Sequence, residues 1–370
     1  MKKVLFVSHT ANFAKFNRNF MRWFREQGWQ VYYASGGEEP IEECDYSYTL
    51  PFNRSPFSFN NVRAYRELKN LIEKEDFNII HCHTPVGGVV TRLAARGVRK
   101  RGTSVIYTGH GLHFYKGAPL LNWILYYPVE KFCSRYTDCL ITINEEDYFN
   151  VRRFKFKAAD IQYVHGVGVS LERFRIHTLP EKEALRQKYG YLPEDYIMIV
   201  VAELNKNKNQ EFIIKSVSHI RKSLPQIKLL LVGKGDQKDV LSDLVKELKL
   251  DGSVFFLGYR NDIDNLLALS DVLVTASYRE GLPVNIMEAM ASGLPVICTD
   301  VRGQRDLIKN GENGFLYAIN DESGFSEAVE KLVADPDIVA RIQNNNVKDV
   351  RIYSTDYVMK EMTAIYKKYM

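Results

Sequence analysis

Hydrophobic and polar positions along the chain follow two alternating periods. Short apolar runs bounded by polar residues, such as residues 3–7 and 30–34, are typical of strands buried on both faces. Between them, residues 13–27 carry apolar side chains at helical spacing and stop at a glycine. The first half continues with predicted helices at 60–75, 86–101 and 120–136 and predicted strands at 78–82, 104–108 and 139–143. Strands that alternate with helices predict a parallel, doubly wound sheet.

The pattern loosens over residues 173–185 and restarts with an apolar run at 196–201, so we expect a domain boundary between residues 172 and 173. The second half has predicted strands at 228–232, 254–257, 272–275 and 294–298, and predicted helices at 210–221, 240–249, 262–269, 284–292, 322–334 and 357–369. The expected domains are residues 1–172 and 173–355, with 356–370 as a final helix. Two doubly wound sheets that face each other leave a cleft at the carboxyl ends of their strands.

The composition is that of an ordinary globular protein, with 370 residues of which 45% are hydrophobic and 26% are charged. No apolar stretch approaches the roughly eighteen residues that a membrane-spanning helix needs, and residues 1–8 are too short for a signal peptide. The five cysteines form no CxxC pair, which favours reduced thiols over disulfides or a zinc site. We therefore expect a cytoplasmic protein.

Positive charge is concentrated in the first half. Residues 1–170 hold 23 Lys and Arg against 16 Asp and Glu, whereas the remainder holds 27 against 29. No nucleic-acid-binding motif accompanies this excess, so we expect no nucleic-acid partner. A basic half also suits an anionic membrane surface.

Residues 280–299 combine two carboxylates, a helix start and a strand. A glycine and a proline interrupt the chain before the amphipathic run 284–292, so Glu280 lies in the turn before a helix N-terminus and Glu288 lies along that helix. Backbone N–H groups at a helix N-terminus attract phosphate, and a carboxylate can accept paired hydrogen bonds from a sugar diol. The segment predicts a ligand with an anion and a polyol; the alternative is two glutamates on a solvated surface.

The signature of retaining glycosyltransferases of family four resembles this segment, which reads EGLPVNIMEAMASGLPVICT. Similar stretches in the second half are LLLVGKGD, VFFLGYRNDIDNLLALSDVLVTAS and NGFL. In the first half, the bacterial capsule and exopolysaccharide branch of the family resembles IIHCHTP, YTGHGLHFYKG, ITINEEDY and VHGVGV. The resemblance implies the α/β GT-B fold, in which an acceptor-binding and a nucleotide-sugar-binding Rossmann-like domain face a central cleft and the last helix crosses back to the first domain.

The resemblance also assigns roles to single residues. It implies that Glu280 binds hydroxyls of the transferred sugar, that Glu288 holds the ribose of the nucleotide, and that His110 faces the donor sugar. The donor is further expected to contact the residues at the start of the helix. These residues are Gly281, Leu282, Pro283 and Val284.

Members of the family bind the diphosphate with an Arg and a Lys that follow the first strand of the second domain. This chain retains the Lys as Lys208, but Glu203 stands at the position of the Arg, and Lys206 is a candidate stand-in. A helix N-terminus and a lysine can stabilise a developing negative charge without a metal, so we expect no metal ion and no cofactor besides the nucleotide-sugar. The alternative is a polar turn that caps the next helix. With Lys208, the expected catalytic residues are Glu280 and His110.

Four histidines, His81, His83, His110 and His113, occur close together in the first half. Their HxH and HxxH spacings raise metal binding as an alternative, although neither has the helical HExxH or Cys-rich context of a zinc site. We expect His81 and His83 to end strands and to shape the cleft.

These features predict a retaining transferase that moves a sugar from a UDP-sugar to a hydroxyl of a lipid-linked saccharide, with undecaprenyl diphosphate as the expected lipid, in capsule or exopolysaccharide synthesis. The resemblance implies front-face retention. Open alternatives are a nucleotide-sugar epimerase or a phosphorylase-like enzyme of the same architecture, and a non-catalytic sugar-binding adaptor, which Glu203 motivates. A dehydrogenase is disfavoured because the first strand-to-helix connection, SHTANF, lacks the GxGxxG fingerprint.

We expect the first domain to bind the inner face of the cell membrane as a peripheral protein. The basic residues of 92–101 and 152–157 and the aromatic-rich stretch 114–127 motivate this expectation. The aromatic side chains expected at the interface are Trp123, Tyr126 and Tyr127. The alternative is that residues 120–136 bury their apolar side against the sheet.

Overall fold

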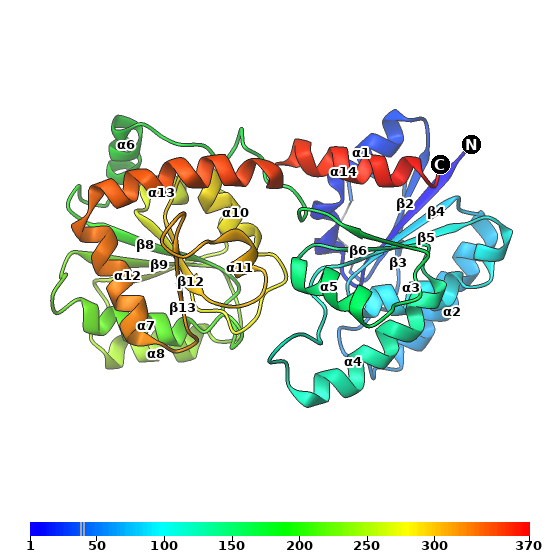
Figure 1. The fold of residues 1–370 in the computed structure, drawn as a ribbon, viewed down its shortest axis with the longest axis horizontal. Coiled ribbons are helices and arrows are strands. Elements are labelled where there is room, and N and C mark those ends of the chain that lie inside the picture. Colours follow the sequence, from blue (N-terminus) through cyan, green and yellow to red (C-terminus); the bar gives the residue numbers. More distant parts are fainter. Residues whose placement is uncertain (38, 40) are drawn as a thin grey trace. The chain divides into compact units, whose positions relative to one another are not determined.

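The computed structural model describes residues 1–37, 39 and 41–370, which form two compact units (Figure 1). Unit 1 consists of Met1–Val167 together with Asp356–Met370, and unit 2 consists of Gly168–Thr355. The division falls five residues before the boundary expected at residue 172. The reason is that Val169 N–H donates to Tyr353 O, and Thr355 N–H donates to Val169 O, both at 2.9 Å. These bonds tie the start of unit 2 to its end.

Unit 1 is built on a parallel sheet with the strand order β3-β2-β1-β4-β5-β6-β7. Its strands are β1 (Lys3–Val7), β2 (Gln30–Ser35), β3 (Tyr46–Thr49), β4 (Ile79–His83), β5 (Ser104–Gly109), β6 (Cys139–Thr142) and β7 (Asp160–Tyr163). Its helices are α1 (Arg18–Glu26), α2 (Asn60–Glu75), α3 (Pro85–Ala95), α4 (Leu120–Cys133), α5 (Glu145–Arg153) and α14 (Thr355–Lys367), with 3₁₀ turns η1 (Ala11–Phe16), η2 (Val98–Arg101) and η3 (Ser134–Tyr136).

Both faces of this sheet are covered, as parallel sheets require. Along β1, Leu5 and Val7 pack in the core under α2 and α3, whereas Val4 and Phe6 pack in the core under α1 and α14. The last helix therefore packs on unit 1, with Tyr366 fully buried.

Unit 2 repeats this design with the parallel strand order β10-β9-β8-β11-β12-β13. Its strands are β8 (Tyr196–Val201), β9 (Ile227–Val232), β10 (Val254–Gly258), β11 (Val272–Thr275), β12 (Val296–Thr299) and β13 (Phe315–Tyr317). Its helices are α6 (Leu179–Tyr189), α7 (Gln210–Ile220), α8 (Lys238–Glu247), α9 (Ile263–Leu269), α10 (Val284–Ala291), α11 (Gln304–Leu307), α12 (Glu322–Ala334) and α13 (Pro336–Asp349), with the 3₁₀ turn η4 (Val350–Tyr353). Helices α7, α8 and α12 bury one face of the sheet.

The predictions from the hydrophobic pattern missed several helices and strands and made two helices too long. Helix α6 lies in the segment expected to be irregular, where a capping box between Thr178 and Glu181 starts the helix despite its weak apolar pattern. The other missed elements are β3, β7, β13, α5, α11 and α13. The helices predicted at 86–101 and 120–136 each end early and continue as a separate 3₁₀ turn. Across the described residues, no helix has both the length and the apolar character needed to cross a bilayer.

In each sheet, the strands that follow the first one are added on one of its sides and then on the other. Strand β1 lies between β2 and β4, and β8 lies between β9 and β11. Doubly wound sheets bind their ligands at the carboxyl ends of the strands next to such a switch point. In unit 2 the relevant loops are therefore residues 202–209 after β8 and residues 276–283 after β11.

Candidate functional site

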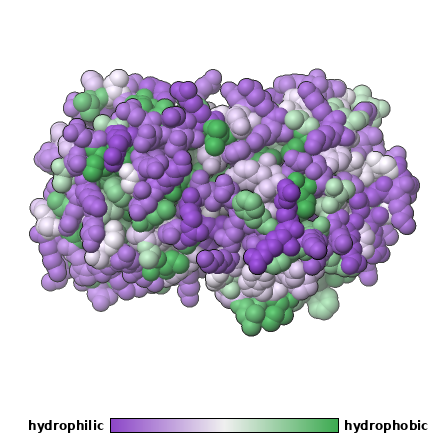
Figure 2. All heavy atoms as spheres, in the orientation of Figure 1, coloured by the Kyte–Doolittle hydropathy of each residue, from purple (hydrophilic) through white to green (hydrophobic). Residues whose placement is uncertain are grey.

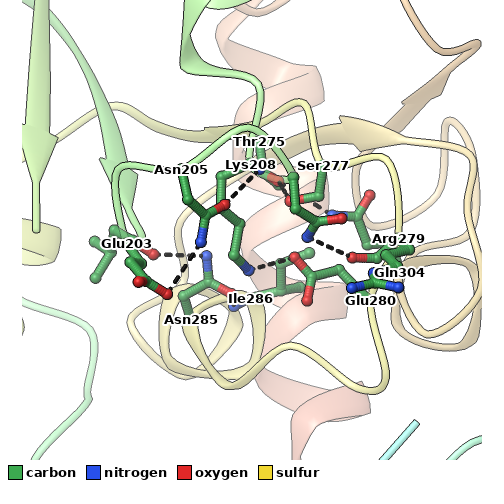
Figure 3. A network of polar contacts seen from close by, with 12 residues as sticks. Glu203, Asn205, Lys208, Thr275, Ser277, Arg279, Glu280, Asn285, Ile286 and Gln304 are labelled. Atoms are coloured by element: carbon green, nitrogen blue, oxygen red, sulfur yellow. Dashed lines mark hydrogen bonds and ion pairs between the residues drawn. The ribbon is translucent and has the colours of Figure 1, made fainter. Parts of the chain in front are cut away.

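The two loops at the switch point of unit 2 bring Lys208 and Glu280 together (Figure 3). Lys208 Nζ lies 2.5 Å from Glu280 Oε1, with the two side chains 22% and 13% exposed. These residues are far apart in the sequence and were predicted from separate motifs. Their contact places a cation and a carboxylate at the edge of the sheet where a ligand is expected.

Backbone and amide hydrogen bonds hold the two loops against each other. Tyr278 N–H donates to Asn207 O at 2.9 Å, and Asn207 Nδ2 donates to Arg279 O at 3.1 Å. Within the first loop, Lys208 N–H donates to Asn205 Oδ1 at 3.1 Å. The asparagines of this segment thus hold Lys208 in place. The segment is a polar turn, as the alternative interpretation predicted, and the same turn positions the lysine that we expect to bind the diphosphate.

Glu203, which stands at the position of the family's arginine, and Lys206, its candidate stand-in, lie in the same loop as Lys208. Glu203 is exposed, and its Oε2 accepts a hydrogen bond of 3.0 Å from Asn205 Nδ2. Lys206 is exposed. The contact with Glu280 therefore distinguishes Lys208 from Lys206.

The loop after β9 closes the other side of this region. A Cβ atom on Gly233 would lie 1.9 Å from Ala202 O, and one on Gly235 would lie 2.0 Å from Leu204 O. Leu204 N–H donates to Lys234 O at 2.9 Å, which fixes this approach. Glycine is required at both positions because the two backbones touch.

Helix α10 begins beside Glu280, as the sequence predicted. Its N-cap is Pro283, in an extended conformation, and Asn285 Nδ2 donates to Val201 O at 3.0 Å, which anchors the first turn to the end of β8. Leu282 is buried, and Glu288 is half-buried one turn into the helix. Gly281 and Val284 are also half-buried.

Arg302 is a site residue that the sequence analysis missed. The residue is 7% exposed, and its Nε donates to Glu280 O at 3.1 Å. The next residue, Gly303, has φ +78°, and a Cβ atom there would lie 2.1 Å from Gly281 O. The available signal was its place in the loop that follows β12, since the carboxyl ends of neighbouring parallel strands meet at one edge of the sheet. Arg302 adds a second cation beside Glu280.

Three of the four histidines meet in unit 1. His83 Nδ1 lies 3.1 Å from His110 Nε2, while His81 Nδ1 lies 2.7 Å from Tyr366 Oη and its Nε2 lies 2.8 Å from Thr108 Oγ1. His113 lies apart and stacks on Tyr126, with ring centroids 4.4 Å apart. Among the described residues, no group of three His, Cys, Asp or Glu side chains is arranged to hold a metal ion.

Burial keeps these histidines neutral. Desolvation lowers the pKa of His110 to about 4 and the pKa of His81 to about 3, and it also holds the pKa of His83 well below 6.5. His83 Nε2 is buried with no hydrogen-bond partner among the described residues. At neutral pH, His110 can therefore exchange hydrogen bonds with a ligand but carries no charge.

Comparison with known proteins identifies the chain. Residues 3–144 match the family model described as glycosyl transferase 4-like, and residues 181–349 match that of glycosyl transferases group 1. EpsD of Bacillus subtilis (strain 168), which is named as a glycosyltransferase, is 42% identical over 370 residues, covering 100% of this chain and 97% of that protein. The chain belongs to the family-four glycosyltransferases.

Other relatives of this glycosyltransferase agree with that assignment. An Escherichia coli enzyme named UDP-Gal:alpha-D-GlcNAc-diphosphoundecaprenol alpha-1,3-galactosyltransferase is 28% identical over 328 residues, covering 85% of this chain and 82% of its own. The crystal structure of Anabaena HepE in complex with UDP and glucose superposes with a TM-score of 0.83 at 17% identity, covering 100% of both chains. The expected family, the GT-B fold and the glycosyltransferase class are confirmed, and the matches do not favour an epimerase or an adaptor.

Proposed function

We propose that this glycosyltransferase transfers a sugar, with retention of anomeric configuration, from a UDP-sugar to a hydroxyl of a lipid-linked saccharide. The single observation that carries the proposal is the contact between Lys208 and Glu280 at the switch point of unit 2. A cation that binds diphosphate and a carboxylate that binds sugar hydroxyls need to be neighbours, because the sugar and the diphosphate share one bond.

The donor site follows from the charges around this pair. The diphosphate binds at the N-terminus of α10, where Pro283 has no side-chain acceptor to cap the helix, although Asn285 Oδ1 accepts the N–H of Ile286 at 3.0 Å. Lys208 stabilises the negative charge that grows as the glycosidic bond breaks, and Arg302 takes the place of the arginine that Glu203 replaces. Glu288 accepts hydrogen bonds from the ribose. Fixed cations of this kind remove the need for a metal ion.

The same contact favours front-face retention. In a double displacement, a carboxylate attacks the anomeric carbon and forms a covalent glycosyl-enzyme. Glu280 is ion-paired with Lys208 at 2.5 Å, which lowers the nucleophilicity of its oxygen. Glu280 therefore orients the sugar, and the acceptor hydroxyl attacks on the face from which UDP leaves.

The proposed acceptor is a saccharide on undecaprenyl diphosphate, in the synthesis of a capsule or an exopolysaccharide. Its support is the name of the E. coli relative, whose acceptor is a GlcNAc-diphosphoundecaprenol. Such an acceptor is anchored in the membrane, so the enzyme works as a peripheral protein at the inner face of the bilayer. His110 is a neutral hydrogen-bonding group at neutral pH, which fits the role that the resemblance assigns to it.

Release of UDP from a panel of UDP-sugars, measured with and without a short-chain lipid-diphosphate saccharide, tests the proposal. We expect acceptor-dependent release with one donor. Lys208→Ala should lower kcat by roughly a hundredfold or more, as loss of a transition-state donor does, whereas Lys206→Ala is the matched control and should retain kcat within about threefold.

Two results contradict the proposal. UDP release that does not depend on acceptor indicates a hydrolase or an epimerase-like enzyme. Tight UDP binding without release from any donor, with both lysines dispensable, indicates the sugar-binding adaptor that Glu203 raised.

A further inference from the structure

Helix α4 of unit 1 is apolar on two opposite faces. One face packs on the core of the unit through Trp123, Tyr126 and Tyr127. The other face is exposed to solvent over its whole length, and Figure 2 shows apolar residues gathered at the lower edge of unit 1, where Figure 1 places α4. This exposed arc consists of Leu120 (74% exposed), Leu121 (62%), Ile124 (59%), Leu125 (37%), Val129 (43%) and Phe132 (48%).

The inner face of α4 is held firmly, so the arc is not exposed by fraying. Trp123 and Tyr127 lie edge-on to Phe154, with ring centroids 5.7 Å and 5.4 Å away. The core of unit 1 holds the side chains of Trp123, Tyr126 and Tyr127, as the alternative in the sequence analysis had it. The side chains of α4 that are open to a membrane are instead the aliphatic ones of the exposed arc.

A buried ion pair fixes α4 to its neighbours. Glu130 Oε2 lies 2.7 Å from Arg92 Nη2, and both side chains are less than 8% exposed. The Arg92 guanidinium also lies 3.9 Å from the ring centre of Tyr107 on β5. Arg92 was among the basic residues expected at the membrane, and this contact shows that prediction to be wrong for Arg92. The helix presents its arc from a rigid support.

Cations border the arc, while no acidic residue interrupts it. Within α4 the charged residues are the buried Glu130 and Lys131. Arg135 follows in η3 and lies 5.8 Å from the ring of Phe132. The exposed basic residues of 152–157 flank Phe154, which packs on the inner face of α4, so they add positive charge near the helix on its packed side rather than along the arc. An apolar strip with a basic margin is typical of a helix that lies in the interface of an anionic bilayer.

We infer that α4 inserts its exposed arc into the headgroup and acyl boundary of an anionic membrane and so docks unit 1 at the surface that holds the acceptor. This inference rests on the proposed lipid-linked acceptor. A membrane is favoured over a protein partner because the arc offers no polar group to fix a register, whereas a specific protein interface carries about one hydrogen bond per 100–200 Å². Salt screens the attraction between the basic residues and the anionic membrane. Because the aliphatic side chains also insert, we expect the protein to stay bound to the membrane when salt is added.

Flotation of the full-length protein with vesicles tests this docking. The vesicles contain phosphatidylcholine alone or with about a third phosphatidylglycerol. We expect binding to the anionic vesicles and a loss of tenfold or more in Leu121→Ser/Ile124→Ser, because each buried aliphatic side chain contributes roughly a factor of ten. The matched control is Leu192→Ser/Val240→Ser in unit 2, at positions 55% and 59% exposed, which should bind as the unchanged protein does.

Leu121→Ser/Ile124→Ser is called the arc variant. The docking is overturned by no binding to anionic vesicles, by equal binding of the arc variant, or by a dimer that the arc variant dissociates, since a second copy would then cover the arc. Binding lost entirely between about 0.05 and 0.3 M salt also overturns it, because the basic margin alone would then suffice. Transfer to a short-chain acceptor without vesicles separates the two proposals. In this assay the arc variant should transfer sugar normally, whereas Lys208→Ala should not. If the protein binds vesicles through the arc but transfers no sugar from any donor, only the proposed function is refuted.

Discussion

Acid should destabilise unit 1 through its buried histidines, and the effect can be assigned to single residues. In the folded unit, burial lowers the pKa of His81 to about 3 and that of His110 to about 4, against 6.5 for a free histidine. Between pH 4 and 6.5 the unfolded chain therefore binds more protons than the folded one. The stability contributed by the neutral rings is complete above pH 6.5 and falls as the pH drops below it.

The size of the effect follows from these pKa values. Each histidine that stays neutral in the fold costs about 1.4 kcal/mol per pH unit below 6.5. At pH 5 each ring therefore lowers the free energy of unfolding by about 2 kcal/mol, and His81 and His110 together lower it by about 4 kcal/mol. That is a large part of the 5–15 kcal/mol typical of a domain.

Tryptophan fluorescence measures this unit alone, because Trp23, Trp29 and Trp123 are the three tryptophans of the chain and all lie in unit 1. Urea unfolding is followed at pH 7.5, 6.5 and 5. His81→Gln keeps an amide for hydrogen bonding but cannot titrate, so its stability should fall by about 2 kcal/mol less between pH 6.5 and 5 than that of the unchanged protein. The control is His177→Gln, at a half-buried histidine of unit 2, which should fall as the unchanged protein does because the change lies outside the unit that the fluorescence reports. An equal fall in His81→Gln and the unchanged protein would refute the reasoning.

The remaining predictions concern the donor site. Glu288→Ala should weaken UDP binding tenfold to hundredfold, about 1.5–3 kcal/mol, by loss of a charge-assisted contact to the ribose, whereas Glu280→Ala should spare UDP affinity and lower kcat; calorimetry and turnover separate the two. Arg302→Met should lower kcat by roughly tenfold or more with a smaller change in KM, and an unchanged kcat would remove Arg302 from the diphosphate site. Gly303→Ala should lower the free energy of unfolding of unit 2 by about 2–5 kcal/mol, because φ is +78° and Gly281 O blocks the new methyl group; circular dichroism in urea checks it.

The sequence contained most of the information on both sheets. Apolar runs of five or six residues were sufficient to predict β1 and β8 because these strands are buried on both faces. Strand β3 was missed because most of its residues are exposed, which leaves no apolar run to detect. Helix α6 was missed for a similar reason, since its start depends on a capping box rather than on an apolar face. Local polar chemistry has a weaker periodic signal than burial does.

The site was partly predictable for a different reason. Lys208 and Glu280 could be named from their motifs, but their contact depends on β8 and β11 being neighbours in the sheet, which no local pattern encodes. Arg302 was missed because the strand before it was predicted but the neighbours of that strand in the sheet were not. Helix α4 has apolar residues on nearly all of its sides, so the spacing of apolar residues along it could not show which side packs on the core.

Because helix α14 belongs to unit 1, this unit is synthesised in two parts, before and after unit 2. The chain leaves the ribosome from its N-terminus at about 5–20 residues per second. The face of the first sheet that receives Tyr366 therefore waits while all of Gly168–Thr355 is made, about 10–40 seconds at that rate. During this time Phe24 and Trp23, which contact Tyr366 in the finished fold, present an aromatic surface to chaperones and to other nascent chains. A premature stop codon directly after Thr355 would leave unit 2 whole but unit 1 permanently open, and we expect such a product to aggregate.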